Sequence, residues 1–197
     1  MKSMKMDKLT LFLIPIGVAV NFIGGQIAIL LRLPLYLDGI GTIVVGALCG
    51  AFPGALVGLI SNVLNSISSP TTLFYAVLSV MFGIVAAIAS KKGIFKNLVK
   101  TMIISLLFAL IGGGLGACIT WIVSGGDFGV ITASAIAAAL YEVVSLPPFI
   151  CQLISEFCMD LLDKFVTLIL VYFILKSMPN RFLAKLPMGD IYATEEE

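Results

Sequence analysis

Apolar residues along this chain form long runs separated by short polar segments. Six of these runs are candidates for membrane-spanning helices, at about 9–31, 38–50, 53–65, 72–89, 98–123 and 149–176. A helix needs about 20 residues to cross the hydrocarbon core of a bilayer. The second and third runs are shorter, so we expect them to tilt against longer helices or to be continued by loops that protein covers. The pattern predicts an all-α membrane protein with six transmembrane helices in one domain, residues 1–197.

The composition supports this prediction. Of the 197 residues, 60% are hydrophobic and only 12% are charged. A soluble domain carries about 25% charged residues, so its surface would hold roughly twice as much charge. We expect the first run to be retained as a span, because no small-residue cleavage site followed by a polar region marks it as a signal peptide.

The distribution of basic residues predicts how the helices are oriented. Ten of the 12 lysines and arginines lie before the first run, between the fourth run and the start of the fifth, or at and after the end of the sixth; the exceptions are Arg32 and Lys164. Basic residues gather in cytoplasmic segments, so we expect residues 1–8 and 178–197 to be cytoplasmic tails. The segments 32–38, 66–72 and 124–148 then lie outside. We interpret the alanine-rich part of the last segment as a helical extension or lid over the outer surface, not as a seventh crossing.

Polar side chains within the runs are candidate ligand contacts, because each must be hydrogen-bonded or face water. Asp38 lies at the outer mouth, where capping of the second helix is an equally simple role. Glu156, Asp160 and Asp163 share one helix face, and Asp160 and Lys164 form an i,i+4 pair. This group either lines a cavity or forms a buried ion pair that holds the sixth helix to a neighbour. The full set of candidate ligand-binding residues is Asn21, Gln26, Asp38, Asn62, Asn65, Tyr75, Tyr141, Glu142, Glu156, Asp160 and Lys164.

These polar residues fall in the outer part of the spans, whereas the inner half of each run is almost entirely apolar. A channel or a self-sufficient carrier usually has a polar path through the membrane. The sequence therefore predicts a cup that is open to the outside and closed on the inside.

Small residues at intervals of four indicate close helix packing. The glycines concerned are Gly17, Gly46, Gly50, Gly54 and Gly58. Two interpretations stay open: packing inside the protein, or a smooth surface on which the helices of a partner protein dock.

The chain has four cysteines without a CxxC pair and no histidine. We expect free thiols and no metal site. No set of catalytic residues is evident, which disfavours an intramembrane enzyme, and nothing indicates a nucleic-acid partner. A structural or regulatory membrane protein is the other alternative.

Two stretches carry a resemblance to a known family: NFIGGQIAILLRLPLYLDGIGTIVVGALCGAFPGALVGLISN at 21–62, with a GxFPG-type turn, and DKFVTLILVYFILKSMPNRF at 163–182. They resemble the S components of energy-coupling factor (ECF) vitamin transporters. The resemblance implies a six-helix, prokaryotic plasma-membrane protein whose first, third and fifth loops close over a vitamin-like ligand.

It also implies as partners a membrane coupling subunit and two cytoplasmic ATPases, which use ATP, whereas this chain binds no cofactor. Several family members dock through an AxxxA pattern in the first helix that this chain lacks, so we expect helices two and three to contribute.

The ionisable residues near the outer mouth indicate the charge of the ligand. Six acids lie there against two bases: Asp38, Asp127, Glu142, Glu156, Asp160 and Asp163 against Arg32 and Lys164. This balance favours a neutral or cationic heterocycle over an anion. Tyrosines such as Tyr36 and Tyr75 are available to stack on it.

Overall fold

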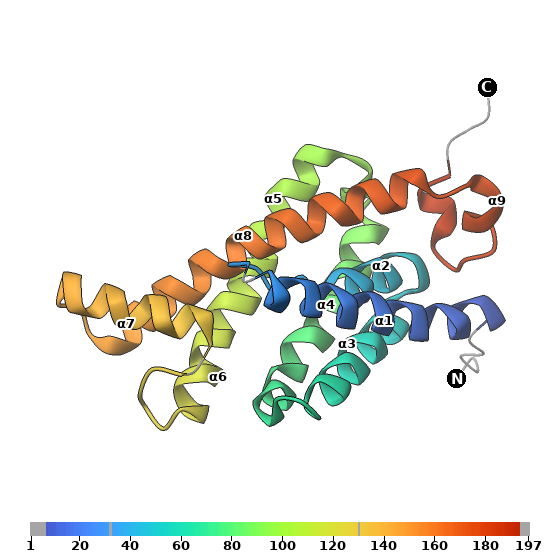
Figure 1. Ribbon diagram of the computed structural model, residues 1–197. Coiled ribbons are helices and arrows are strands. Elements are labelled where there is room, and N and C mark those ends of the chain that lie inside the picture. The colour runs from blue at the N-terminus through green and yellow to red at the C-terminus, as the bar shows by residue number, and fades with distance from the viewer. Residues whose placement is uncertain (1–6, 32, 130, 194–197) are drawn as a thin grey trace, which may run out of the picture.

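The computed structural model describes residues 7–31, 33–129 and 131–193, and all regular structure within them is helical. Figure 1 shows the elements: α1 (Lys8–Leu30), α2 (Ile40–Cys49), α3 (Ala51–Asn65), η1 (Pro70–Tyr75), α4 (Ala76–Lys91), η2 (Ile94–Lys96), α5 (Leu98–Ala109), η3 (Leu110–Leu115), α6 (Gly116–Val123), α7 (Thr132–Val144), α8 (Pro148–Ser177), α9 (Asn180–Leu183) and η4 (Gly189–Ile191).

Three helical segments among the described residues are long and apolar enough to cross a membrane: Lys8–Leu30, Pro70–Lys91 and Leu98–Val123. This agrees with an all-α membrane protein. Helices α2 and α3 are shorter, with 10 and 15 residues. Helix α8 has 30 residues, but four ionisable side chains lie along its middle. The six-span arrangement stays a prediction.

Helices α2, α3 and α4 pack with their backbones in close contact. A methyl group at Gly46 would lie 2.6 Å from the carbonyl oxygen of Gly83, and one at Gly54 would lie 2.6 Å from the Cα atom of Gly46. A methyl group at Gly58 would lie 2.6 Å from the carbonyl oxygen of Ser79. These glycines permit the approach because they have no side chain.

The predicted docking surface is therefore corrected in favour of internal packing. Gly17, Gly46, Gly54 and Gly58 are all buried, and Gly17 faces the side chains of Val45 and Val57. Gly50 has a different role, since it joins α2 to α3 with a φ of 101°, a backbone conformation that favours glycine. None of the five provides a smooth outer face.

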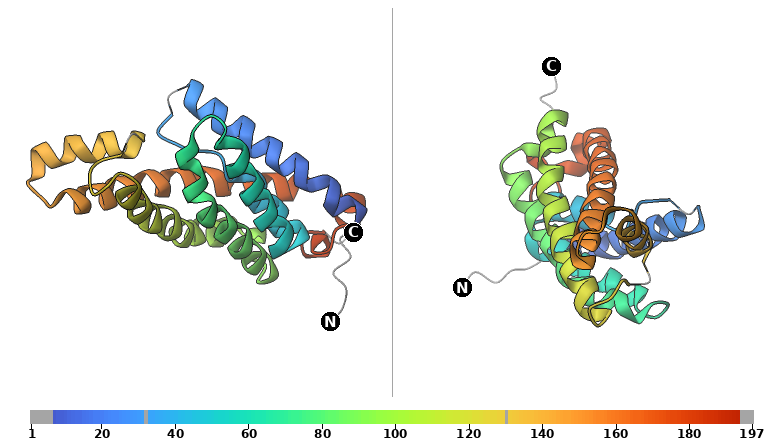
Figure 2. Two further views of the ribbon diagram at one scale, coloured as in Figure 1. Left: turned by 90° about the horizontal axis from the view of Figure 1, so that it is seen from below. Right: turned by 90° about the vertical axis from the view of Figure 1, so that its left-hand side faces the viewer.

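Helix α8, with 30 residues, packs against helices from both halves of the chain. It runs beside the continuous helix formed by α5, η3 and α6, and α7 folds back along its first half, as Figures 1 and 2 show. The hydroxyl of Ser155 donates to the carbonyl oxygen of Ala133 at 2.6 Å and so joins α8 to α7. The alanine-rich segment is thus a helix packed on α8.

The helix ends that carry most of the basic residues lie together near the C-terminal end of α8. Here the start of α1, the α2–α3 turn and the end of α4 lie near residues 178–193. The amide of Met188 donates to the carbonyl oxygen of Leu48 at 3.0 Å, and the Tyr192 hydroxyl donates to Ser90 Oγ at 2.6 Å. We name this the basic end. Its described basic residues are Lys8, Lys91, Lys92, Lys96, Lys100, Lys176, Arg181 and Lys185.

The residues Lys2, Lys5 and Arg32 lie outside the described part of the chain.

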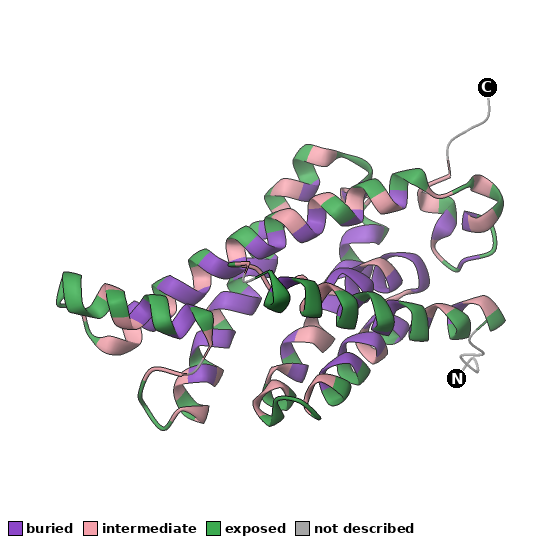
Figure 3. Cartoon of the chain, in the orientation of Figure 1, coloured by how far each residue is buried: buried purple, intermediate pink, exposed green. Residues whose placement is uncertain are grey.

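Around the basic half of α8 the core is apolar, with Leu168, Val171 and Leu175 all at most 1% exposed. Helix α1 differs in burial, because its outward face is exposed, as Figure 3 shows. That face is apolar as well, with Ile29 72% exposed, which suits contact with lipid.

Candidate functional site

A row of polar side chains is buried along the first half of α8. It consists of Gln152, Glu156, Asp160, Asp163 and Lys164, and each is at most 5% exposed. Spacings of three and four residues place them on one face of the helix. We name this group the α8 polar row. Buried charges are costly unless they are paired, so the partners of each group decide what the row can do.

Lys164 lies between two carboxylates of its own helix. Its Nζ is 3.1 Å from Asp160 Oδ1 and 2.6 Å from Asp163 Oδ2. The same nitrogen lies 4.7 Å from the centre of the Phe82 ring on α4. The i,i+4 pair predicted from the sequence is confirmed, with Asp163 as an additional partner.

Asp163 also holds the loop between α1 and α2. Its Oδ1 accepts hydrogen bonds from the amides of Tyr36 and Leu37, both at 2.8 Å. Leu37 has a φ of 54°, a left-handed conformation that costs a leucine about 1–2 kcal/mol. The carboxylate therefore fixes a strained turn of the α1–α2 loop against the middle of α8.

Two further residues of this loop lie near the row. The N-cap of α2 is Gly39, and no side chain caps the helix, so the alternative that Asp38 is a helix cap is wrong. Asp38 is partly buried. Burial, followed by the nearby Glu156 and Asp160 carboxylates, raises the pKa of the Tyr36 hydroxyl. That hydroxyl is consequently a hydrogen-bond donor close to the acidic groups.

The glycine-rich segment η3 and the start of α6 form the opposite wall. Segment η3 is a π-helix, a form found often at functional sites. A methyl group on Gly112 would overlap the Asp160 carboxylate, and one on Gly116 would lie 2.9 Å from Glu156 Oε2. Glycine at these positions lets the acidic side chains lie directly on the neighbouring backbone.

Two acceptor atoms of the row have no hydrogen-bond partner among the described residues. They are Gln152 Oε1 and Asp160 Oδ2, and both atoms are buried. The amide nitrogen of Gln152 is engaged, since it donates to Ser134 Oγ at 3.0 Å and to Glu156 Oε1 at 2.8 Å. Buried acceptors are nearly always hydrogen-bonded, so these two oxygens are exceptions within the described part of the chain.

The structure places Asn21 in a junction away from the row. Its Nδ2 donates to Thr42 Oγ1 at 2.8 Å and to Ser61 Oγ at 2.9 Å. Its Oδ1 accepts from the amides of Gly41 at 2.7 Å and Thr42 at 3.3 Å. All four hydrogen-bonding positions of the amide are used to join α1, α2 and α3.

Three other candidates also lie apart from the row. Asn62 joins α3 to α4 by donating to Ser79 Oγ at 2.6 Å. Gln26 is exposed on α1, and Asn65 is partly buried at the end of α3. Tyr75 is closer to the row, because its hydroxyl lies 2.7 Å from Thr120 Oγ1 on α6.

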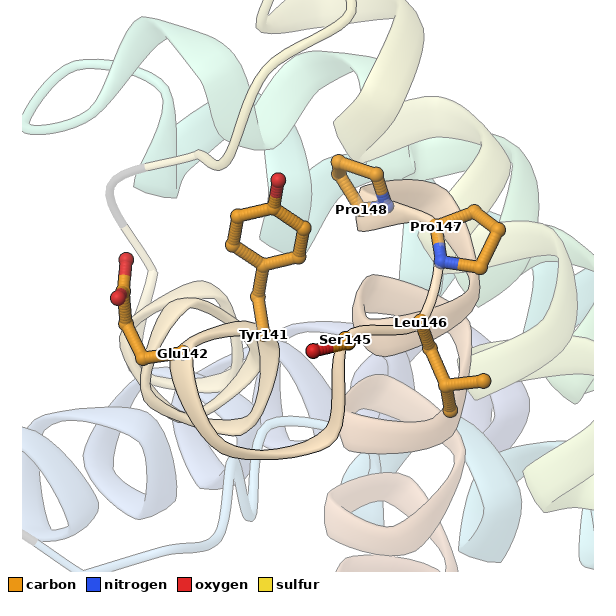
Figure 4. A pocket seen from close by; sticks show the side chains of 6 residues that line it. All are labelled: Tyr141, Glu142, Ser145, Leu146, Pro147 and Pro148. Carbon is orange, nitrogen blue, oxygen red and sulfur yellow. The ribbon is translucent and has the colours of Figure 1, made fainter.

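Tyr141 and Glu142 belong to a separate surface hollow of about 520 Å³ where α7 meets α8. Figure 4 shows both side chains extending from α7, with Pro147 and Pro148 across from Tyr141. The Tyr141 ring lies 5.9 Å from Phe128. This hollow is open to the surface and does not include the α8 polar row.

Sequence reasoning did not select Gln152 or Thr120. The interval of four from Gln152 to Glu156 and again to Asp160 is a usable signal for the first. Thr120 has no such signal, because only the packing of α6 against η1 brings it to Tyr75. No three acidic or cysteine side chains among the described residues are grouped so that they could hold a metal ion.

Fold and site together define an α-helical membrane protein with an acid-rich row buried along α8. Comparison of the chain with protein-family models, curated proteins and solved structures gives no match.

Proposed function

We propose that this chain is a solute-binding membrane protein that acts as the S component of an ECF-type importer. The observation that carries the proposal is the α8 polar row, which has two buried acceptors without a partner among the described residues and a loop held at one end by Asp163. On the same helix, toward the basic end, the buried side chains after Thr167 are apolar: Leu168, Val171 and Leu175. A site of this kind captures a solute from one side and does not conduct it to the other.

In this proposal α8 spans the membrane in spite of its ionisable residues. Those residues are buried against other helices, while the exposed positions of α8 from Ile154 to Phe173 are apolar, for example Leu162 at 56% and Phe173 at 55%. The helix therefore presents a hydrocarbon surface to lipid. With α1, α2, α3, α4 and the α5–α6 helix, this gives six spans.

The basic end faces the cytoplasm in this arrangement, as the positive-inside rule requires. The α8 polar row then lies toward the outside, and both termini are cytoplasmic. The ligand is a small vitamin-like heterocycle, neutral or cationic, that donates hydrogen bonds to Gln152 Oε1 or Asp160 Oδ2. Tyr36 and Tyr75 supply aromatic surface beside it.

The partners are a membrane coupling subunit and two cytoplasmic ATPases. With the glycines occupied in internal packing, the exposed apolar surface of α1 and α3 is the candidate docking face. It contains a groove of about 570 Å³, lined by Leu11, Ile14, Pro15, Val18, Ala19, Phe22, Ile60 and Leu64. A helix of the coupling subunit fits such a groove through close apolar packing.

The test is to purify the full chain in detergent and to identify the small molecules it carries by mass spectrometry. We expect about one equivalent of a single compound per chain. Gln152→Leu, which removes a free acceptor, should lower this amount at least tenfold, whereas Glu142→Gln in the separate hollow should leave it unchanged. A chain that carries no compound would refute the proposal in favour of a structural role, and turnover of the compound would favour an enzyme.

A further inference from the structure

The α8 polar row has more acidic than basic groups. Glu156, Asp160 and Asp163 contribute three carboxyl groups, and Lys164 contributes the single ammonium group. With all four groups ionised, the row has a net charge of −2. Asp38 adds a further carboxyl group from the loop above. Buried negative charge is strongly unfavourable unless a proton or a cation neutralises it, and the row itself supplies one cation for three carboxyl groups.

The contacts show which carboxylate oxygen is left without a hydrogen bond. Asp163 accepts two backbone amides and Lys164, so both of its oxygens are used. Glu156 accepts from Gln152. Asp160 receives Lys164 only on Oδ1, at 3.1 Å, and its Oδ2 is buried with no partner among the described residues.

The surroundings of this oxygen are restricted. The Asp160 carboxylate lies against Gly112 of the π-helix, where any side chain would overlap it. The residue is 5% exposed. An acceptor in this position favours a donor that is small or planar and that brings its own positive charge.

We propose that the captured solute carries a positively charged, hydrogen-bond-donating group, either an ammonium or a protonated amino-heterocycle, and that this group binds to Asp160 Oδ2. The inference rests on the proposed function and narrows its ligand class from neutral or cationic to cationic. Gly112 has no side chain to cover this carboxylate, and the Tyr36 hydroxyl in the loop lies near Glu156 and Asp160. One carboxylate oxygen supplies a metal ion with too few ligands, so the cation is organic.

Two substitutions test the assignment on the full chain purified in detergent. Asp160→Asn removes the charge and keeps the shape, and Lys164 retains Asp163 as its partner. Gly112→Ala keeps every charge but places a methyl group on the carboxylate. Gly114→Ala is the matched control, because a methyl group at this position of the same π-helix meets nothing within 4 Å.

The readout is the amount of co-purified compound per chain and its charge at pH 7, both from mass spectrometry. We expect a cationic compound whose amount falls at least tenfold in Asp160→Asn and Gly112→Ala and stays within twofold of wild type in Gly114→Ala. If Asp160→Asn does not fold, the comparison of Gly112→Ala with Gly114→Ala decides alone.

A neutral or anionic compound in the wild-type protein would overturn the inference while leaving the proposed function intact. Equal occupancy in Gly112→Ala and Gly114→Ala would also overturn it. A wild-type chain without any compound would overturn both. If 150 mM NaCl, compared with choline chloride, raises the unfolding temperature of the wild type but not of Asp160→Asn, the cation is inorganic and the organic assignment fails.

Discussion

Asp163 gives the sharpest prediction about stability, because its carboxylate joins three groups that have no alternative partner of equal quality. Asp163→Ala removes the acceptor of the Tyr36 and Leu37 amides, at 2.8 Å each, and the closer of the two partners of Lys164, at 2.6 Å. The outer loop and α8 lose their direct connection in one step.

The expected cost follows from the same contacts. Removing one partner of a buried ion pair costs about 3–5 kcal/mol. Each amide left without an acceptor adds about 1–3 kcal/mol unless the loop moves to water. When the loop moves to water, both amides are hydrated and the left-handed Leu37 is released, which returns about 1–2 kcal/mol, so we expect a net loss of about 1–4 kcal/mol. For a chain of this size this corresponds to a decrease in the unfolding temperature of about 2–16 °C.

Asp163→Asn separates the two contributions. The amide oxygen still accepts from the loop, while the charge opposite Lys164 is lost, so we expect roughly half of the full effect. Glu142→Ala is the control, since Glu142 is exposed on α7. It should shift the unfolding temperature by no more than about 2 °C.

The assay uses the cysteines of the chain. Cys49 and Cys151 are buried, whereas Cys118 and Cys158 are exposed. In a background with both exposed cysteines replaced by serine, a thiol-reactive dye reports unfolding as the buried thiols become accessible. If Asp163→Ala melts within about 2 °C of Glu142→Ala, Asp163 does not hold the loop against α8.

Other contacts make three further predictions. Asn21→Ala should lower the free energy of unfolding by about 2–3 kcal/mol, because it removes an acceptor and two donor positions from the junction of α1, α2 and α3. The amount of compound bound per folded chain should stay at the wild-type level. A fall in that amount would show that Asn21 belongs to the ligand site. Ala19→Trp fills the α1–α3 groove and should abolish co-purification of the coupling subunit and its ATPases, while Ile103→Trp on the exposed face of α5 should not; equal effects would exclude the groove as the docking face. Burial raises the pKa of Tyr192 to about 12, above the ordinary value of 10.0; the stabilisation of the C-terminal segment is therefore complete below pH 10 and lost as pH rises toward 12, which limited proteolysis should detect in the wild type and not in Tyr192→Phe.

Much of the fold could be predicted from local patterns. The apolar runs at 9–31, 53–65 and 98–123 correspond closely to α1, α3 and the continuous α5–α6 helix. The polar spacing along 156–164 predicted the common face of α8 and the Asp160–Lys164 pair. These features depend on residues that are near in the sequence, and helix geometry alone relates them.

The candidate site could be predicted only in part. Glu156, Asp160 and Lys164 do lie together, but Asn21 and Asn62 are engaged in joining helices, and Tyr141 and Glu142 belong to another surface. Amides and tyrosines look alike in the sequence whether they face a cavity or a neighbouring backbone.

Local sequence was sufficient to predict a chain that is helical, suited to a membrane and basic at particular helix ends, because hydrophobic periodicity and charge are properties of each segment. Three-dimensional packing was needed to show that the glycines are internal, that Asp163 holds the outer loop and that Asp160 Oδ2 is left without a described partner. Those outcomes depend on which backbone reaches which side chain across more than a hundred residues, as Tyr36 reaches Asp163. Such contacts arise when all the helices pack at once, and no single stretch of the chain contains them.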